Sequence, residues 1–218
     1  MKIFTDKSKR KALIIGLLLL MIFELVIVVS NAFVSQSEET ELYRESYAIQ
    51  SELEKVFSNV FTISDAYVSY ISDNPDLTRE ETETFLQHLL VYEENYVKNI
   101  AYIENTTIKY NFPYEENKDS IGVDLSQVAQ QSVDIIYIKT TQESLFVGPV
   151  DLVQGGRAFI LRTPVSIDGE YHGQIATVID AEELTNLLEI EAKKYNVELK
   201  IGYPREESFI SIGDNFDD

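Results

Sequence analysis

The first 34 residues combine a basic segment with a long apolar stretch. Residues 1–11 carry five Lys or Arg residues against one Asp, and the 23 residues of 12–34 that follow contain a single charged residue, Glu24. A helix of 23 residues is about 35 Å long, whereas the hydrocarbon core of a bilayer is about 30 Å thick. The pattern therefore predicts a transmembrane helix over residues 12–34.

The position of the basic residues also predicts an orientation. Lys and Arg beside a span stay in the cytoplasm, so residues 1–11 form a cytoplasmic tail of a single-pass cell-membrane protein and everything after Val34 is extracytoplasmic. The alternative is a cleaved secretory signal, because Ser30-Asn31-Ala32 resembles a cleavage site. A signal core has roughly 7–15 apolar residues, which favours the uncleaved anchor. Both interpretations export the rest of the chain.

The overall charge excludes one large class of functions. The sequence holds 18 Lys and Arg against 37 Asp and Glu, a net charge of −19, which repels the phosphate backbone of nucleic acids. We therefore expect no nucleic-acid partner. The absence of Cys excludes disulfides, thiolate zinc sites and cysteine nucleophiles, so an exported domain has to be stabilised by its core.

Beyond the apolar stretch, apolar residues recur every seven positions. Eight of nine positions are apolar in two rows, Leu42, Ile49, Val56, Ile63 and Tyr70, and Ser46, Leu53, Val60 and Tyr67. Residues 35–72 lack Gly and Pro, and Asp73-Asn74-Pro75 follows, so we expect a stalk helix within residues 35–76. The β-branched residues of the first row favour a parallel two-stranded coiled coil and hence a homodimer.

An alternative use of the same stripe stays open. One long helix can lay it on the domain of its own chain, and Phe57 and Phe61, which lie just off the rows, indicate that the helix touches that domain as well.

Residues 77–218 have the pattern of a mixed globular domain. Thr78 with Glu81 forms a capping box, and Asp168-Gly169 is a hairpin turn signal. The expected helices are 78–93, 126–140 and, capped by Asp180, 180–195; the expected strands are 97–103, 108–112, 145–147, 157–167, 171–179 and 197–203. The fold class is therefore α+β, an antiparallel sheet with flanking helices.

Motifs for catalysis are absent from the sequence. It contains no Gly-x-Ser-x-Gly elbow, phosphate loop, dinucleotide fingerprint or His-Glu-x-x-His. We expect His88 and His172 to be surface or half-buried residues, and the acidic clusters at 80–81 and 214–218 lack calcium-loop spacing. We predict no enzymatic activity, no cofactor and no metal site.

Residues 121–184 resemble the CHASE domain, the extracytoplasmic sensor of histidine kinases and of nucleotide and diguanylate cyclases. The resemblance is carried by Asp124, Gly148-Pro149, Gln154-Gly155-Gly156, Arg162-Thr163-Pro164-Val165, Gly173, and Asp180 with Leu184. It implies a stalk helix leading into PAS-like sensor lobes, a dimer, and a small ligand in the membrane-distal lobe.

The resemblance also implies ligand-contact positions. Asp124 matches a carboxylate that binds ligand in the plant cytokinin receptors of the family, Leu145 matches a pocket wall, and Gln154-Gly155 matches a polar turn. Gly155 replaces a hydroxyl residue of those receptors and Arg162 lies on the adjacent strand, so cytokinin itself is not expected.

Physical reasoning about the same residues predicts a polar-tipped pocket. Asp124 and Arg162 can orient a small molecule while Leu145, Val147 and Ile160 exclude water. The alternatives are that Asp124 caps a helix and that Arg162 is a surface or paired strand residue.

Members of the family usually continue into a second membrane helix and a cytoplasmic kinase or cyclase, and no second apolar run follows Tyr203. We therefore expect the ligand-sensing portion of a membrane-anchored signalling receptor, either truncated or standing alone, without an output domain. The alternatives are a membrane-anchored protein-interaction or adhesion module with no small ligand and, more weakly, an exported hydrolase.

Overall fold

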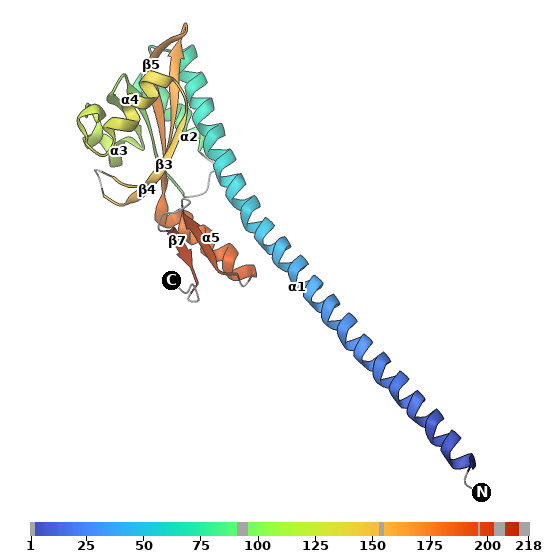
Figure 1. The fold of residues 1–218 in the computed structure, drawn as a ribbon. Coiled ribbons are helices and arrows are strands. Elements are labelled where there is room, and N and C mark those ends of the chain that lie inside the picture. Colours follow the sequence, from blue (N-terminus) through green and yellow to red (C-terminus); the bar gives the residue numbers. More distant parts are fainter. Residues whose placement is uncertain (1–2, 91–95, 153–154, 196, 203–207, 214–218) are drawn as a thin grey trace. The chain divides into compact units, whose positions relative to one another are not determined.

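The computed structural model describes residues 3–90, 96–152, 155–195, 197–202 and 208–213 (Figure 1). Side chains of the first helix are described from residue 21 onward, with gaps up to residue 42. The chain divides into two compact units, residues 1–50 and 51–218, and the boundary between them falls inside that helix.

Helix α1 (Ile3–Asp73) is continuous through both predicted N-terminal segments. It ends where the sequence predicted, two residues before Pro75, because proline excludes the helical conformation of the residue before it. Among the described residues, no helix combines the length and the hydropathy needed to cross a membrane. The predicted span at 12–34 lies partly outside the described side chains and stays a prediction.

The second unit is built on a five-stranded antiparallel sheet of order β2-β1-β5-β4-β3. The strands are β1 (Val97–Glu104), β2 (Thr107–Phe112), β3 (Leu145–Asp151), β4 (Arg157–Ile167) and β5 (Glu170–Asp180). A two-stranded sheet, β6 (Leu199–Gly202) with β7 (Ser208–Ile212), follows. The helices of this unit are α2 (Arg79–Leu89), α3 (Tyr114–Asn117), α4 (Ser132–Thr141) and α5 (Ala181–Tyr195), and the 3-10 turns are η1 (Lys118–Ser120) and η2 (Leu125–Gln127). The predicted α+β class with an antiparallel sheet is confirmed.

The five-stranded sheet buries a hydrophobic cluster on each face. Because side chains alternate along a strand, Ile100 and Tyr102 of β1 join the cluster under α1 and α2, whereas Ala101 and Ile103 join the cluster on the α4 face (Figure 1). The first cluster includes Ile63, Tyr67, Ile71, Leu86, Val165 and Ile175, and the second includes Leu125, Ile135, Ile160, Ala176 and Val178.

The heptad stripe from Val56 onward packs on the domain of its own chain. Val56, Val60, Ile63 and Tyr67 are at most 2% exposed. Ser64 adds a buried hydrogen bond to Thr163, with 2.8 Å between the two hydroxyl oxygens. These positions are therefore occupied within the monomer, as the alternative interpretation predicted. A coiled-coil seam through them is wrong, and the homodimer stays a prediction.

The two phenylalanines beside the stripe differ in outcome. Phe57 contacts the sheet through the ring of Phe146, edge to face at 5.2 Å between centroids, so that prediction is confirmed. Phe61 is 43% exposed, and its contact with the domain stays a prediction.

Local signals placed several elements correctly. The capping box of Thr78 and Glu81 starts α2, and the β4–β5 hairpin turns at Asp168 and Gly169, whose φ angles of 54° and 82° fit a type I′ turn. The Asp180 carboxylate caps α5 by accepting from the backbone N–H groups of Glu182 and Glu183 at 2.9 and 3.3 Å.

The predicted helix over 126–140 was wrong in its first six residues. The chain forms η2 there, and α4 begins only at Ser132. The reason is local: the Asp124 carboxylate accepts from both the backbone N–H and the hydroxyl of Ser126, and Val128 is extended.

Three smaller predictions also shift. Helix 78–93 ends at Leu89, and residues 91–95 lie outside the described residues. Strand 145–147 continues to Asp151. The last predicted strand is β6, and Tyr203 lies outside the described residues.

The ion pair and helix cap of Asp180 should make the stability of the fold sensitive to acid. Burial raises the pKa of its carboxyl, but the Lys98 ammonium at 2.9 Å and the two capping amides outweigh burial and hold the pKa below its ordinary value. A depressed folded-state pKa stabilises the fold above the unfolded-state pKa of about 3.9, and this stability is lost as pH falls through the lower folded value.

Exchange of Asp180→Asn keeps the cap and removes the charge. We expect the exchange to lower the free energy of unfolding by about 1 kcal/mol or less at pH 7. It should have no effect at an acidic pH where the wild-type carboxyl is protonated, and urea unfolding at the two pH values measures both. Asp151→Asn in the more exposed pair with Arg157 is the control. An equal cost at every pH would contradict the assignment.

Candidate ligand cavity

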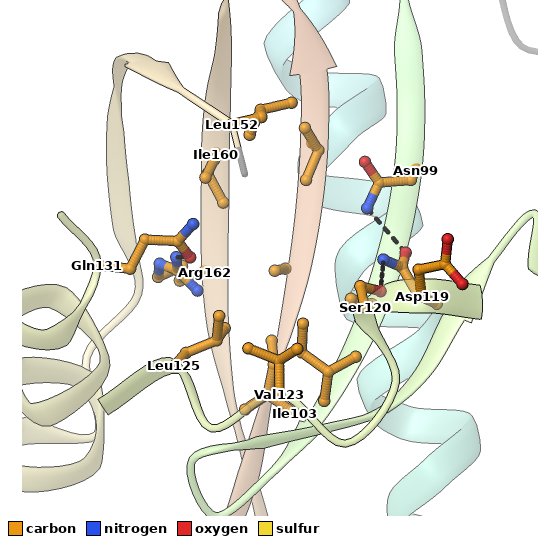
Figure 2. A pocket seen from close by; sticks show the side chains of 15 residues that line it. Asn99, Ile103, Asp119, Ser120, Val123, Leu125, Gln131, Leu152, Ile160 and Arg162 are labelled. Carbon is orange, nitrogen blue, oxygen red and sulfur yellow. Dashed lines mark hydrogen bonds between the residues drawn. The ribbon is translucent and has the colours of Figure 1, made fainter. Parts of the chain in front are cut away.

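A cavity of about 400 Å³ lies on the α4 face of the five-stranded sheet. Its floor is formed by β1, β5 and β4, and its cover by the connection between β2 and α4, which brings in Ser120, Val123 and Leu125. Figure 2 shows the lining side chains converging on this space from opposite sides. The segments that line the cavity are far apart in the sequence, so the cavity exists only once the sheet has formed.

The floor is lowest in the middle because its central side chains are small. Ala101 of β1, Ala176 of β5 and Arg162 of β4 lie in one row across the sheet. Two alanines next to one arginine leave an open apolar surface beside the guanidinium. Ile160 and Val178 form the next row and close the floor.

Arg162 forms one wall of the cavity. Its side chain is 1% exposed, and its Nη2 donates to the Gln131 amide oxygen at 2.9 Å. Its Nε and Nη1 have no hydrogen-bond partner within the described chain. Burial lowers the pKa of the guanidinium to about 10, an effect that the Asp134 carboxylate partly offsets, so the group is charged at neutral pH.

The other wall is a chain of amide and hydroxyl groups. Asn99 donates to the Asn111 amide oxygen at 2.8 Å, and Asn111 donates to the Ser120 hydroxyl at 2.9 Å (Figure 2). Asn99 is 3% exposed, and its own amide oxygen has no partner in the described residues. Asp119, an exposed residue, also belongs to the lining on this side.

The residues predicted for the pocket are separated by the structure. Arg162 lines the cavity and is buried, so the surface interpretation of this residue is wrong. Asp124 caps η2, as the alternative predicted, and hydrogen bonds from Ser126 hold the pKa of its carboxyl below its ordinary value. The side chain that enters the cavity here is its neighbour Leu125.

The remaining predicted residues are Leu145, Val147, Gln154 and Gly155. Leu145 and Val147 are on β3, where Leu145 pairs in register with Arg162, and neither is among the lining residues found in the described chain. Gly155 lies in a turn with φ of 92°, and Gln154 lies outside the described residues. Their roles as ligand contacts stay predictions.

Asn99, Asn111 and Gln131 line the cavity and were missed by the sequence reasoning. A signal was present for Asn99, because it shares the inward face of β1 with Ala101 and Ile103, where a polar residue interrupts an apolar row. Gln131 had no signal, since it follows an irregular turn.

The other candidate chemistry is sparse. His88 and His172 are both exposed, which confirms the expectation for them. Among the described residues, no group of three or more His, Asp or Glu side chains could hold a metal ion.

Comparison with known proteins gives matches at the level of structure. No family model and no curated protein matches the chain. An extracellular ligand-binding receptor from Desulfohalobium retbaense superposes with a TM-score of 0.64 at 20% identity, over 77% of this chain and 31% of that chain. The ligand-binding domain of the Campylobacter jejuni chemoreceptor Tlp3, in complex with 4-methylisoleucine, gives 0.54 at 13% identity, over 82% and 74%.

A third match is the extracellular domain of rpHK1S-Z16, assigned as a histidine kinase, with a TM-score of 0.53 at 17% identity over 72% of this chain and 63% of that chain. The fold is that of extracellular sensory domains. The chain spans about a third of the length of the Desulfohalobium receptor. The resemblance to CHASE in particular is not among the matches found.

Proposed function

We propose that this chain is the extracytoplasmic sensing part of a membrane-anchored receptor and that it binds a small organic anion in the cavity. The observation that carries the proposal is Arg162, a charged and fully buried guanidinium with two unpartnered nitrogens at a cavity wall.

A buried charge without a counter-charge is costly. Removal of an ion from water costs several kcal/mol unless it is paired and its hydrogen bonds are made. Gln131 satisfies one N–H of Arg162, and no ion pair of this residue is found in the described chain. A carboxylate matches the fork of guanidinium N–H groups and would supply a directly paired charge and the missing acceptors together.

The similar structures support a small ligand of this chemistry. The 4-methylisoleucine of the Tlp3 complex is an amino acid and carries a carboxylate. We extend to this chain the class of ligand, an organic carboxylate, and not the compound.

Membrane anchoring belongs to the same proposal. Eight large apolar side chains between Met21 and Phe33 are 43–73% exposed on α1, a surface that lipid tolerates far better than water does. Together with the basic residues of 1–11, they support the predicted anchor with the second unit outside the cytoplasm. The CHASE resemblance of 121–184, the stalk homodimer and a signal output located on another segment or chain are also parts of this proposal.

A panel of carboxylates and their amides tests the binding claim. Butanoate, succinate and L-alanine are compared with butanamide, succinamide and L-alaninamide by thermal shift of the full chain in mild detergent. We expect at least one carboxylate to stabilise the fold by about 2.7 kcal/mol at a hundred times its Kd, and its amide to do nothing. Equal effects of acid and amide, or none from any acid, would overturn the proposal.

The alternative of a protein-interaction module rests on one observation. Val133, Ile136 and Tyr137 lie on one side of α4 and are 76%, 53% and 41% exposed. If no carboxylate of the panel shifted the unfolding temperature, this function would be favoured over ligand sensing.

A further inference from the structure

We infer that the cavity is built for a ligand that carries its anionic group and its ammonium group at opposite ends, an ω-amino carboxylate. This inference rests on the proposed function, because it takes Arg162 as the anion-binding end and asks what the facing wall requires.

The two walls are far apart across the sheet. Arg162 pairs with Ala176 of β5, whereas Asn99 of β1 pairs with Val178 of the same strand, two residues further along. Because β5 lies between them, β4 and β1 are two strand spacings of about 4.8 Å apart, and two residues along a strand add about 7 Å at right angles. The Cα atoms of Arg162 and Asn99 are therefore separated by about 12 Å. Figure 2 shows Arg162 with Gln131 on one side of the cavity and Asn99, Asp119 and Ser120 on the other.

The wall opposite Arg162 offers acceptors. The unpartnered amide oxygen of Asn99 is buried, and a buried acceptor without a donor is costly. Asp119, on the same side of the cavity, adds a nearby negative charge. An alkylammonium provides three N–H donors and a positive charge, and it suits both groups at once.

The placement of Arg162 and Asn99 on opposite sides of the cavity disfavours an α-amino acid. Its ammonium nitrogen and carboxylate carbon are about 2.5 Å apart, so it places both charges at one wall and leaves the other unsatisfied. An extended 4-amino or 5-amino carboxylate separates the two groups by about 5–6 Å. Its methylene chain would lie over Ala101 and Ala176, the two small side chains between the walls.

Amino-acid isomers of equal composition and charge, with the unsubstituted acid as a reference, test this geometry. The full chain in mild detergent is titrated by calorimetry with butanoate, 2-aminobutanoate and 4-aminobutanoate, and with the corresponding five-carbon set. We expect an ω-amino isomer to bind at least about tenfold more tightly than its α-amino isomer and than the unsubstituted acid, because a charge-assisted hydrogen bond is gained at the second wall.

An Asp119→Asn variant tests the second wall directly. It should reduce the preference for the ω-amino isomer over butanoate about threefold or more. Glu116→Gln, an exposed acid of α3 outside the cavity lining, is the matched control and should leave this preference unchanged.

The possible outcomes distinguish a failure of the two-ended site from a failure of the proposed function. If the α-amino isomer binds as tightly as the ω-amino isomer, or Asp119→Asn leaves the preference intact, the two-ended site is wrong while anion binding stands. If none of these acids binds, the two-ended site is wrong, and the proposed function fails as well if succinate and L-alanine also have no effect.

Discussion

Exchange of Arg162→Met is expected to abolish carboxylate binding and to leave the fold as stable as before or more stable. The guanidinium is buried with two of its three nitrogens unpartnered, so in the free protein its desolvation is poorly compensated. Apolar replacement of a buried charged group at similar volume is often neutral or stabilising. Loss of two charge-assisted hydrogen bonds to the ligand should cost about 3 kcal/mol or more, a factor above about 100 in Kd.

The measurement pairs calorimetric titration with thermal unfolding of the free chain. Arg157→Met, at the exposed start of the same strand, is the control and should change neither quantity by much. Arg162→Lys keeps the charge without the bidentate geometry and should bind weakly. A large drop in stability of the free Arg162→Met variant would show that Arg162 stabilises the fold and would contradict its role as a ligand-binding residue.

Elements with strong local signals were predictable from the sequence. The turn at Asp168-Gly169 requires two residues that tolerate positive φ, and the chain places them between two runs of strand-forming residues. Two helix starts are capped by neighbours in the sequence. The side chains of Thr78 and Asp180 accept hydrogen bonds from free backbone N–H groups two or three residues further on. Such elements need no information from the rest of the chain.

The cavity was only partly predictable, because its walls are assembled across the sheet. Arg162 was identified, but its hydrogen-bond partner Gln131 is 31 residues away in sequence. Asp124 carried the family resemblance, and its short side chain instead bonds Ser126 two residues on. A competition between a local hydrogen bond and a distant ligand cannot be decided from spacing alone.

The heptad stripe shows a second limit of pattern reasoning. A row of apolar residues every seven positions states that one face of a helix is buried and does not state against what. Here the sheet of the same chain covers the stripe from Val56 to Tyr67, with the Ser64 to Thr163 hydrogen bond fixing the register. The polar partner at position 163 is invisible in the helix sequence.

Exchange of Ile63→Ala is expected to destabilise the second unit by about 2–5 kcal/mol. Ile63 is 2% exposed and packs in the cluster with Val165 and Ile175 of the sheet, so truncation leaves a cavity that the rigid helix and sheet cannot close. The corresponding loss in Tm is roughly 5–15 °C for a domain of this size.

The dependence on protein concentration distinguishes the two uses of the stripe. If Ile63 stabilised a dimer seam, the loss in Tm would grow on dilution, because subunit binding contributes to stability through mass action. Burial against the sheet of the same chain makes the loss independent of concentration. Phe61→Ala on the same helix, where the side chain is 43% exposed, is the matched control and should change stability by no more than about 0.5 kcal/mol. A concentration-dependent effect of Ile63→Ala would return this part of α1 to the dimer.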